Sequence, residues 1–377
     1  MTLPSPSRRR FVSAFGAAVG AAAVRPPATA AGARLGLAGE PVVDLSSNEN
    51  PYGPSPEALE AMTRAQAVAC RYPDASEKET IEAIARHHGV SPDRIVLGCG
   101  SSEVLRLCDA AFLGPGRTVV AAEPTFEAVL YYAKVTTAEG VKVPLTPDFR
   151  HDLPAMARAC DARTGLVYVC NPNNPTGTIV TGDEFLSFLA RVPGTATVVV
   201  DEAYHHFVED PGYRSAMDAL ERFPNLVVAR TFSKVYGMAG MRLGYAVASA
   251  ANAERLRSFA SWSNTNAAVL AAARASLADE ALPARQRARI NGARRWLCAE
   301  LERDGRRVIP SHANFVMIDV GGDVKPLIAA FETKGIKVGR RFAAMPSWLR
   351  VTIGTPEETR AFLEALRAIS PARPAAA

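Results

Sequence analysis

The sequence predicts an α/β fold, with a large domain built on a mostly parallel sheet that helices cover on both faces, and a smaller α+β domain at the C-terminal end. Hydrophobic residues make up 48% of the 377 residues, which suffices to bury a large core in more than one lobe. Apolar, strand-like runs without period-two alternation are separated by helix-length segments, as in parallel sheets buried on both faces. After about residue 262 this pattern ends.

Five segments of the central region are expected to contain strands, because each is apolar or β-branched and ends in polar residues. They are 94–100, 118–126, 165–177, 196–204 and 225–234. A glycine turn follows the first strand and leads into an amphipathic helix over 101–113. Functional groups of parallel sheets gather beyond the carboxyl ends of the strands, so the polar tails of these segments mark the expected site.

The C-terminal region is expected to form the second domain. One long helix is predicted over 284–305, followed by two short strands over 313–320 and 349–354 and a closing helix. These patterns divide the chain into four expected parts. They are a signal segment over 1–30, an arm over 31–50, the large domain over 51–262 and the small domain over 263–377.

Charge and cysteine content argue against several classes of protein. The formal net charge is +5, but four arginines in the acid-free first thirty residues supply most of it, so the rest of the chain is close to neutral. Nucleic-acid binding and stable membrane association therefore have no electrostatic support. The six cysteines show no C-x-x-C spacing and the histidine pairs have no third ligand in view, which favours structural thiols over a metal site or a disulfide framework.

The N-terminal segment has the layout of an export signal. Arg8 and Arg9 precede Phe11, an apolar stretch over 14–24 follows, and "ATA" stands ahead of Ala31. The arginine pair indicates the twin-arginine route, and the apolar stretch is too short to span a bilayer. We therefore expect residues 1–30 to be removed and the mature protein to be periplasmic or otherwise exported. A disordered Ala-rich leader or a misplaced start codon, with a cytoplasmic protein, is the alternative.

Polar residues follow two of the expected strands. Gly100, Ser101 and Ser102 open the helix after the first strand, where free backbone N–H groups and hydroxyls suit a phosphate. Taken alone, this glycine turn also fits a dinucleotide-binding turn or a plain tight turn. Asn174, in "NPNNPTG", places an amide after a buried strand, although such Pro- and Asn-rich segments are also ordinary turns.

The next two strand ends carry charge. Asp201 stands at one of them with Tyr204 three residues on, and a buried acid is costly unless a cation or a donor pairs with it. The residues after the other strand are Thr231, Ser233 and Lys234, with Arg242 eight residues beyond the lysine. Together these groups need one ligand that offers a phosphate, a cationic nitrogen for Asp201 and a carbonyl for Lys234.

Five motifs in this order resemble the fold-type-I pyridoxal-phosphate aminotransferases, and most closely the histidinol-phosphate aminotransferase group. They are "NENPYG", "RYPD", "NPNNPTG", "DEAY" and "SKVYGMAGMRLG", and the resemblance covers about residues 40 to 369. It implies an aspartate-aminotransferase-like fold, pyridoxal 5′-phosphate as cofactor, a small-molecule amino donor and a 2-oxo acid acceptor, and a homodimer with shared active sites.

The resemblance also implies roles for the residues named above. Lys234 matches the lysine that forms a Schiff base with the cofactor and then carries protons, which requires an amine whose pKa is lowered by burial and nearby cations. Asp201 matches the acid that keeps the pyridine nitrogen protonated, so that the cofactor works as an electron sink. Asn174 and Tyr204 match the partners of the ring phenolate oxygen.

Further positions match the family's cofactor contacts. Phe126 falls where the family stacks an aromatic ring, usually tyrosine, on the cofactor. Tyr72 matches a tyrosine that reaches the cofactor phosphate of the neighbouring subunit. For both residues ordinary core packing is the alternative. The phosphate cradle of the family corresponds to Gly100, Ser101, Ser102, Ser233 and Arg242, with Thr231 as a further candidate.

The residues expected to bind the substrate match those of the family less completely. Arg350 corresponds to the arginine that binds a substrate carboxylate or phosphate as a bidentate fork, and Asn314 to a supporting asparagine. Gly339 stands where the family's usual arginine is expected, with Arg340 and Arg341 beside it; we take Arg340 as the substrate-binding candidate. The N-terminal segment that shapes the pocket of histidinol-phosphate enzymes is not recognisable. An exported protein would also have little use for an intermediate of cytoplasmic histidine synthesis.

These departures favour an amino-acid or amine transaminase of unassigned specificity, with histidinol-phosphate aminotransferase as the alternative. A decarboxylase or racemase would use the same Lys234 and Asp201, although Arg350 favours holding a carboxylate. A non-enzymatic pyridoxal-phosphate sensor would carry a DNA-binding domain, and none is found. A nucleotide-dependent enzyme is disfavoured because "GCGSSE" lacks the third glycine of the dinucleotide fingerprint.

Overall fold

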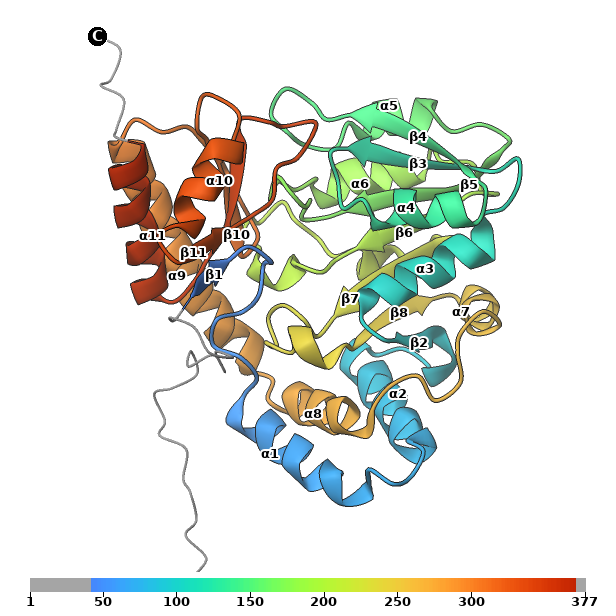
Figure 1. The fold of residues 1–377 in the computed structure, drawn as a ribbon. Helices are drawn as coiled ribbons and strands as arrows, with labels where there is room; N and C mark the ends of the chain where they lie inside the picture. Colours follow the sequence, from blue (N-terminus) through green and yellow to red (C-terminus); the bar gives the residue numbers. More distant parts are fainter. Residues whose placement is uncertain (1–41, 371–377) are drawn as a thin grey trace, which may run out of the picture. The chain divides into compact units, whose positions relative to one another are not determined.

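Residues 42–370 are described by the computed structural model, and a seven-stranded sheet in the order β2-β8-β7-β6-β5-β3-β4 lies at their centre (Figure 1). Its strands are β2 (Ile95–Gly98), β3 (Thr118–Glu123), β4 (Glu139–Pro144), β5 (Thr164–Cys170), β6 (Thr197–Asp201), β7 (Leu226–Thr231) and β8 (Gly244–Ala248). Strands β4, β3, β5, β6 and β7 run parallel, and β8 is antiparallel to both of its neighbours. The predicted mostly parallel sheet is confirmed; β4 and β8 lie where no strand is predicted.

Helices cover both faces of this sheet, as the unalternating strand sequences predict. Along β6, Val198 and Val200 pack into one apolar cluster with residues of α2, α5, α6 and α8, whereas Val199 packs into another with residues of α3, α4 and α7. Figure 1 shows α3 and α4 lying across the sheet. The helices are α1 (Pro56–Ala65), α2 (Asp74–His88), α3 (Ser101–Phe112), α4 (Ala128–Val135), α5 (Leu153–Arg158), α6 (Gly182–Leu189), α7 (Ala250–Arg257) and α8 (Ala267–Ala278).

The C-terminal region forms its own small sheet beside a long helix. Strands β9, β10 and β12 pair antiparallel in the order β12-β10-β9, and the predicted strands over 313–320 and 349–354 are its β10 and β12. A two-stranded parallel sheet joins β1 to β11, so the end of the predicted arm pairs with this region. The elements are β1 (Val43–Leu45), α9 (Leu282–Arg303), β9 (Val308–Ile309), β10 (Phe315–Asp319), α10 (Lys325–Glu332), β11 (Ile336–Val338), β12 (Trp348–Thr352) and α11 (Pro356–Ile369).

Local sequence signals set several helix ends. Thr181 begins α6 and Thr355 begins α11 as capping boxes, in which each threonine hydroxyl accepts from the backbone N–H three residues on and a glutamate there accepts in return. Gly89 ends α2 in the left-handed conformation, at φ 64°. Short 3-10 turns are η1 (Gln66–Val68), η2 (Pro92–Arg94), η3 (His205–Phe207), η4 (Ala216–Ala219) and η5 (Ala239–Met241).

Three further observations concern the predictions on domains, membranes and thiols. The predicted signal segment, 1–30, lies outside the described residues, and the domain limits at 50/51 and 262/263 stay predictions. Among the described helices, none combines the length and the apolar character needed to cross a membrane. All six cysteines lie within residues 42–370, and each is a free thiol.

Candidate active site

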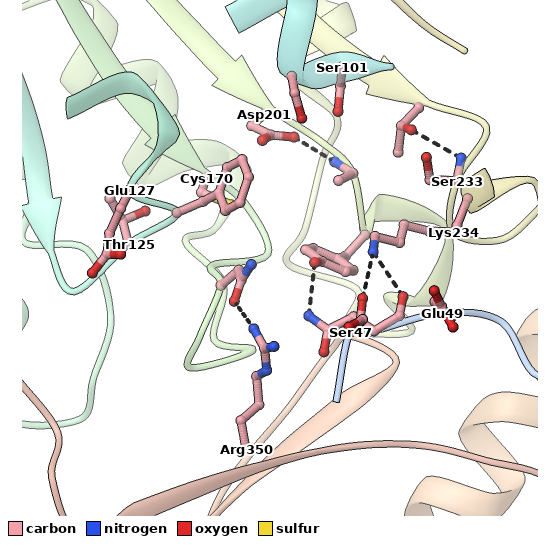
Figure 2. A pocket seen from close by; sticks show the side chains of 18 of the residues that line it. Ser47, Glu49, Ser101, Thr125, Glu127, Cys170, Asp201, Ser233, Lys234 and Arg350 are labelled. Atoms are coloured by element: carbon pink, nitrogen blue, oxygen red, sulfur yellow. Dashed lines mark hydrogen bonds between the residues drawn. The ribbon is translucent and has the colours of Figure 1, made fainter. Parts of the chain in front are cut away.

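A cavity of about 410 Å³ opens at the carboxyl ends of the parallel strands and is lined by polar side chains from both regions of the fold. Most of the side chains predicted from the sequence meet in it (Figure 2). They are Ser101, Ser102, Phe126, Asn174, Asp201, Tyr204, Thr231, Ser233, Lys234, Arg242, Arg340 and Arg350. No group of three or more metal-ligating side chains is arranged to hold a metal ion anywhere in residues 42–370.

Lys234 follows β7 and extends into the cavity. Its Nζ donates to the backbone oxygen of Asn48 at 2.9 Å and of Ser47 at 3.4 Å, so the loop after β1 fixes the amine (Figure 2). Burial, together with the positive charge of Arg350, lowers the pKa of Lys234 to about 8. An amine of this kind is partly unprotonated near neutral pH and can therefore act as a nucleophile or as a base.

Asp201 ends β6 and is buried. One carboxylate oxygen accepts from the Tyr168 hydroxyl and the other from the Ala203 backbone N–H, both at 3.0 Å. Burial raises the pKa of Asp201 to about 6, although these two hydrogen bonds oppose the shift. The remaining acceptor capacity of this carboxylate suits a cationic nitrogen that enters the cavity.

Tyr204 and Asn174, which also line the cavity, are already held by hydrogen bonds. The Tyr204 hydroxyl accepts from Asn48 Nδ2 at 3.0 Å, and burial raises its pKa well above the usual range. The side-chain oxygen of Asn174 accepts from Arg350 Nη1 at 2.8 Å (Figure 2). Both side chains are therefore fixed before any ligand binds, which favours precise ligand orientation.

The start of α3 and Arg242 form one corner suited to an anion. Gly100 precedes α3 at φ 79°, and a Cβ there would lie 2.1 Å from Arg242 Nη2, so only glycine lets the guanidinium approach the helix start. Arg242 Nη1 also donates to Ser233 Oγ at 3.3 Å. Backbone N–H groups at the start of the twelve-residue α3, the Ser101 hydroxyl and this cation make a corner with the donors and the positive charge that a phosphate requires.

Arg350 lies on β12, at the other end of the cavity. Its Nη2 donates to the Ser46 backbone oxygen at 2.7 Å, and its buried Nε has no hydrogen-bond partner among the described residues. The guanidinium also lies over the Phe342 ring at 5.3 Å. A substrate carboxylate is the partner that would satisfy the remaining N–H.

Gly339 holds the position where the resemblance leads one to expect an arginine. A Cβ at Gly339 would lie 2.6 Å from the Arg350 backbone oxygen, so the packing of β11 against β12 leaves no room for a side chain. The neighbouring Arg340 reaches the cavity instead and donates to Glu127 at 2.6 Å.

Three predicted site residues lie outside the cavity lining: Gly100, described above, Asn314 and Tyr72. Asn314 is buried, and its side-chain amide donates to the backbone oxygens of Asn48 and Glu49 at 3.0 and 3.3 Å, so it positions the loop that holds Lys234. Tyr72 is 86% exposed. The lining residues that the sequence interpretation omitted are Ser47, Asn48, Glu49, Thr125, Glu127, Cys170, Ala203, Ala239 and Phe342; the "NENPYG" motif could have indicated Asn48 and Glu49.

Comparisons with known proteins agree with this site. The family model "Aminotransferase class I and II" matches residues 40–366. The chain is 38% identical to a histidinol-phosphate aminotransferase of Moorella thermoacetica, over 87% of this chain and 85% of that protein. It is 40% identical to an aromatic amino acid aminotransferase of Cutibacterium acnes, over 87% of this chain and 92% of that protein.

A solved structure shares the architecture. The histidinol-phosphate aminotransferase of Sinorhizobium meliloti, in complex with pyridoxal-5′-phosphate, superposes with a TM-score of 0.82 at 27% identity. The alignment covers 87% of this chain and 92% of that one. Fold and site therefore define a fold-type-I pyridoxal-phosphate enzyme. The chain belongs to the class I and II aminotransferase family.

The protein is thus a transaminase that moves an amino group between an amino compound and a 2-oxo acid with pyridoxal phosphate as cofactor, which confirms the predicted fold class, reaction and cofactor. The residues present fit this cofactor. The buried Asp201 has acceptor capacity for a cationic nitrogen, and the corner at Gly100 and Arg242 suits a phosphate. The Lys234 amine, with its lowered pKa, lies in the same cavity.

Proposed function

We propose that Lys234 holds the cofactor through a Schiff base and that the enzyme acts on amino acids or amines rather than on histidinol phosphate alone. The assignment of Lys234 is supported mainly by one observation. Lys234 is the lysine that lines the described cavity, and burial lowers its pKa to about 8. The proposal that histidinol phosphate is not the only substrate is supported by Gly339, where packing leaves no room for the arginine expected in the histidinol-phosphate group.

Each residue then has a definite task in the transfer. When bound, pyridoxal phosphate supplies an electron sink for the substrate α-carbon. Asp201 holds a proton on the ring nitrogen through its carboxylate, and Lys234 Nζ accepts a proton and returns it at the neighbouring carbon. Arg350 binds the substrate carboxylate through the N–H groups that its present partners leave open.

The remaining side chains bind and orient. The start of α3, Ser233 and Arg242 hold the cofactor phosphate. Asn174 and Tyr204 orient the ring oxygen, and Phe126, half-buried in the cavity wall, packs on the ring. Asn48 connects these parts, because its backbone oxygen accepts from Lys234 and its side chain donates to Tyr204.

Histidinol-phosphate aminotransferase remains the second candidate, since relatives with that name reach 38% to 41% identity. To separate the two, the cofactor-loaded protein is incubated with single donors, histidinol phosphate among them, and 2-oxo acids, and the amino-acid and oxo-acid products are quantified. Turnover of ordinary amino acids at rates equal to or above that of histidinol phosphate supports the proposal. Turnover of histidinol phosphate alone contradicts it, and carbon dioxide release or racemised product would indicate the other reaction classes.

The active unit is proposed to be a homodimer in which Tyr72 completes the partner's site. Tyr72 is 86% and Trp262 is 96% exposed, which is unusual for aromatic side chains away from an interface. Their loops adjoin, because Ser263 Oγ donates to Asp74 Oδ1 at 2.9 Å. The two aromatic side chains therefore belong to one surface that a second subunit can cover.

Export through the twin-arginine route is proposed for the segment outside the described residues. This route carries folded proteins, which suits an enzyme that acquires its cofactor in the cytoplasm. Replacing Arg8 and Arg9 by lysine keeps the charge but removes the recognised pair, so export should stop. Cell fractionation with N-terminal sequencing of the mature protein checks this. An intact Met1 in the cytoplasmic fraction would reject export and strengthen the case for histidinol phosphate.

A further inference from the structure

A second cavity, of about 580 Å³, shares no lining residue with the active site. Its walls come from two regions of the fold: the segments 147–150 and 178–181 belong to the large sheet region, and the segment 307–312 and Trp348 belong to the C-terminal region. The volume lies within the range of small-molecule sites, about 300 to 1,000 Å³. Because no group in its lining has a task in transamination, the cavity is a candidate for a ligand other than the cofactor and the substrate.

Hydrogen bonds within the protein hold the walls of this second cavity. Thr178 Oγ1 donates to the Phe149 backbone oxygen at 2.7 Å, and Arg150 Nε donates to the Ile179 backbone oxygen at 2.8 Å. The His312 backbone N–H donates to the Gly177 backbone oxygen at 2.8 Å, which ties the C-terminal region to the turn beside the cavity. A ligand therefore enters a site whose walls are already ordered, and binding requires little further ordering.

Two aromatic rings form the apolar part of the lining. Phe149 and Trp348 meet edge to face with their ring centres 5.0 Å apart, and Trp348 is only 7% exposed. Phe149 has φ 63°, a left-handed conformation that is strained for a bulky side chain, and a tight turn holds it there because its N–H donates to the Thr146 oxygen at 2.8 Å. Strained residues of this kind cluster at ligand sites. The strained backbone thus keeps an aromatic ring at the wall of the cavity.

Arg307 is the cation of the lining that has open donors. Its guanidinium carbon lies 5.3 Å from the centre of the Trp348 ring and 5.8 Å from that of Phe149. Within residues 42–370 its side chain forms no hydrogen bond or ion pair, whereas Arg150 is engaged by Glu184. The guanidinium N–H groups can therefore bind a carboxylate that enters the cavity.

Two carboxylates complete the lining. Asp148 Oδ1 accepts from the Thr146 hydroxyl at 2.5 Å, and Asp210 Oδ1 accepts from the Gly212 backbone N–H at 2.8 Å. Neither aspartate forms an ion pair with a cation of the described part of the chain. The second oxygen of each carboxylate is thus available to an ammonium group.

We propose that this second cavity binds an α-amino acid with an apolar side chain. Its carboxylate binds Arg307, and its ammonium group binds Asp148 or Asp210. The side chain packs against Trp348 and Ile179, both of which are buried. The inference goes beyond the proposed function, because catalysis uses the other cavity.

The fluorescence of Trp348 reports binding at this cavity directly. The chain has three tryptophans, and neither Trp262 nor Trp296 lines the cavity, so replacing both by phenylalanine leaves Trp348 as the reporter. The cofactor-loaded protein is first reduced with borohydride, which prevents transamination of the probe, and is then titrated with L-phenylalanine. The emission of Trp348, excited where phenylalanine does not absorb, should change saturably. An emission that does not change would overturn the proposal.

The variant Arg307→Gln in the same reporter background tests the assigned contact. The Kd for L-phenylalanine should rise about fivefold or more, a loss between that of an exposed ion pair and that of a buried charged hydrogen bond. Arg303→Gln is the control, because this exposed arginine at the end of α9 bonds Glu300 and does not line the cavity. Its Kd should stay unchanged. Equal Kd values for Arg307→Gln and its parent, or equal losses in both variants, would reject the proposal.

A folding defect in Arg307→Gln is excluded by measuring its transamination before reduction. Arg307 lines only the second cavity, so kcat and KM should equal those of the parent. A loss of turnover as large as the loss of binding would show a general defect and would contradict the assigned contact.

The probe 3-phenylpropionate has the same ring and carboxylate as L-phenylalanine but no ammonium group. It should bind about twofold to fivefold more weakly, because a water-exposed ion pair with Asp148 or Asp210 contributes about that much. Equal or tighter binding of 3-phenylpropionate would reject the amino acid as the ligand and indicate a simple aromatic carboxylate.

These measurements separate this inference from the proposed function, since binding at the second cavity needs no turnover. If the wild-type enzyme transaminates amino acids but Trp348 does not respond, only the present inference fails. If borohydride fixes no cofactor on Lys234, the proposed function fails, and the titration is made on the unreduced protein.

Discussion

Asp201 and Lys234 show how burial prepares an acid and a base for chemistry near neutral pH. The pKa of Asp201 rises to about 6 and that of Lys234 falls to about 8, and in both cases desolvation is the largest cause. The residue types and their places after strands are visible in the sequence. The pKa shifts cannot be seen in the sequence. They depend on how Tyr168, Asn48 and Arg350 pack around the carboxylate and the amine.

Asp201→Asn should slow transamination by several orders of magnitude while the fold is kept. A neutral amide cannot hold a proton on the ring nitrogen of the cofactor, so the electron sink weakens. Steady-state kinetics, with cofactor content and circular dichroism as controls for binding and folding, check this. A variant that binds the cofactor and turns over at a near-normal rate would show that the assigned role is wrong.

Asp109 carries a pH dependence of stability that is unrelated to the site. This α3 side chain is buried, neither of its oxygens has a hydrogen-bond partner among the described residues, and burial raises its pKa to about 8. In the unfolded chain an aspartate titrates near 3.9. A raised pKa in the folded state gives stability that is fully present below the unfolded value and is lost as pH rises through about 8.

Asp109→Asn should therefore remove this loss, because an amide does not ionise. Compared with wild type, the variant should gain thermal stability progressively between pH 4 and pH 8, measured as Tm by calorimetry. Asp183→Asn, which changes an exposed carboxylate on α6, should leave the pH profile as it is. A wild-type and an Asp109→Asn profile that run parallel across this range would contradict the account.

At the scale of elements, parallel neighbours bring the functional groups together. In the register of β5, β6 and β7, Cys170 pairs with Asp201 and Asp201 with Ala229, so the segments that carry Asn174, Asp201 and Lys234 leave the sheet side by side. The sequence predicts these strands and their polar ends. It does not predict the strand order or the antiparallel β8, because pairing between distant segments leaves no local signal.

The start of α3 is the element proposed to hold the cofactor phosphate. Gly100→Ala would place a Cβ 2.1 Å from Arg242 Nη2 at a positive φ, so the guanidinium must move away from the phosphate corner. Affinity for pyridoxal phosphate, measured by titrating the cofactor-free protein, should fall about tenfold or more, as expected for a lost charged contact. Gly114→Ala, near the other end of α3 with open space around it, is the control. Equal affinity of the two variants for pyridoxal phosphate would count against a phosphate site at the start of α3.

At the scale of the whole molecule, contacts between distant segments complete the site. β1 pairs with β11, and the loop after β1 holds Lys234 and Tyr204 through Asn48. The sequence shows the motif that contains Asn48, but a three-residue strand in an arm gives no periodicity from which to infer its partner. For the same reason the sequence does not predict that Glu127 and Phe342 contact Arg340. These contacts depend on how two regions of the fold pack against each other.

The proposed homodimer predicts complementation between two inactive variants. Tyr72→Ala and Lys234→Ala should each be inactive or nearly so, and mixing with subunit exchange should restore part of the activity, because one site of each hybrid is intact. Activity is measured before and after exchange, and native mass spectrometry shows the hybrid. Proven exchange without any recovered activity would reject the shared site.

Lys234 is proposed to be the residue that carries pyridoxal phosphate. Borohydride reduction of the cofactor-loaded enzyme, followed by digestion and mass spectrometry, tests it directly. The mass of the reduced cofactor should appear on the peptide containing Lys234, and Lys234→Ala should show no labelled peptide. A label on another lysine, or a wild-type protein that stays colourless and unlabelled after incubation with the cofactor, would contradict the account.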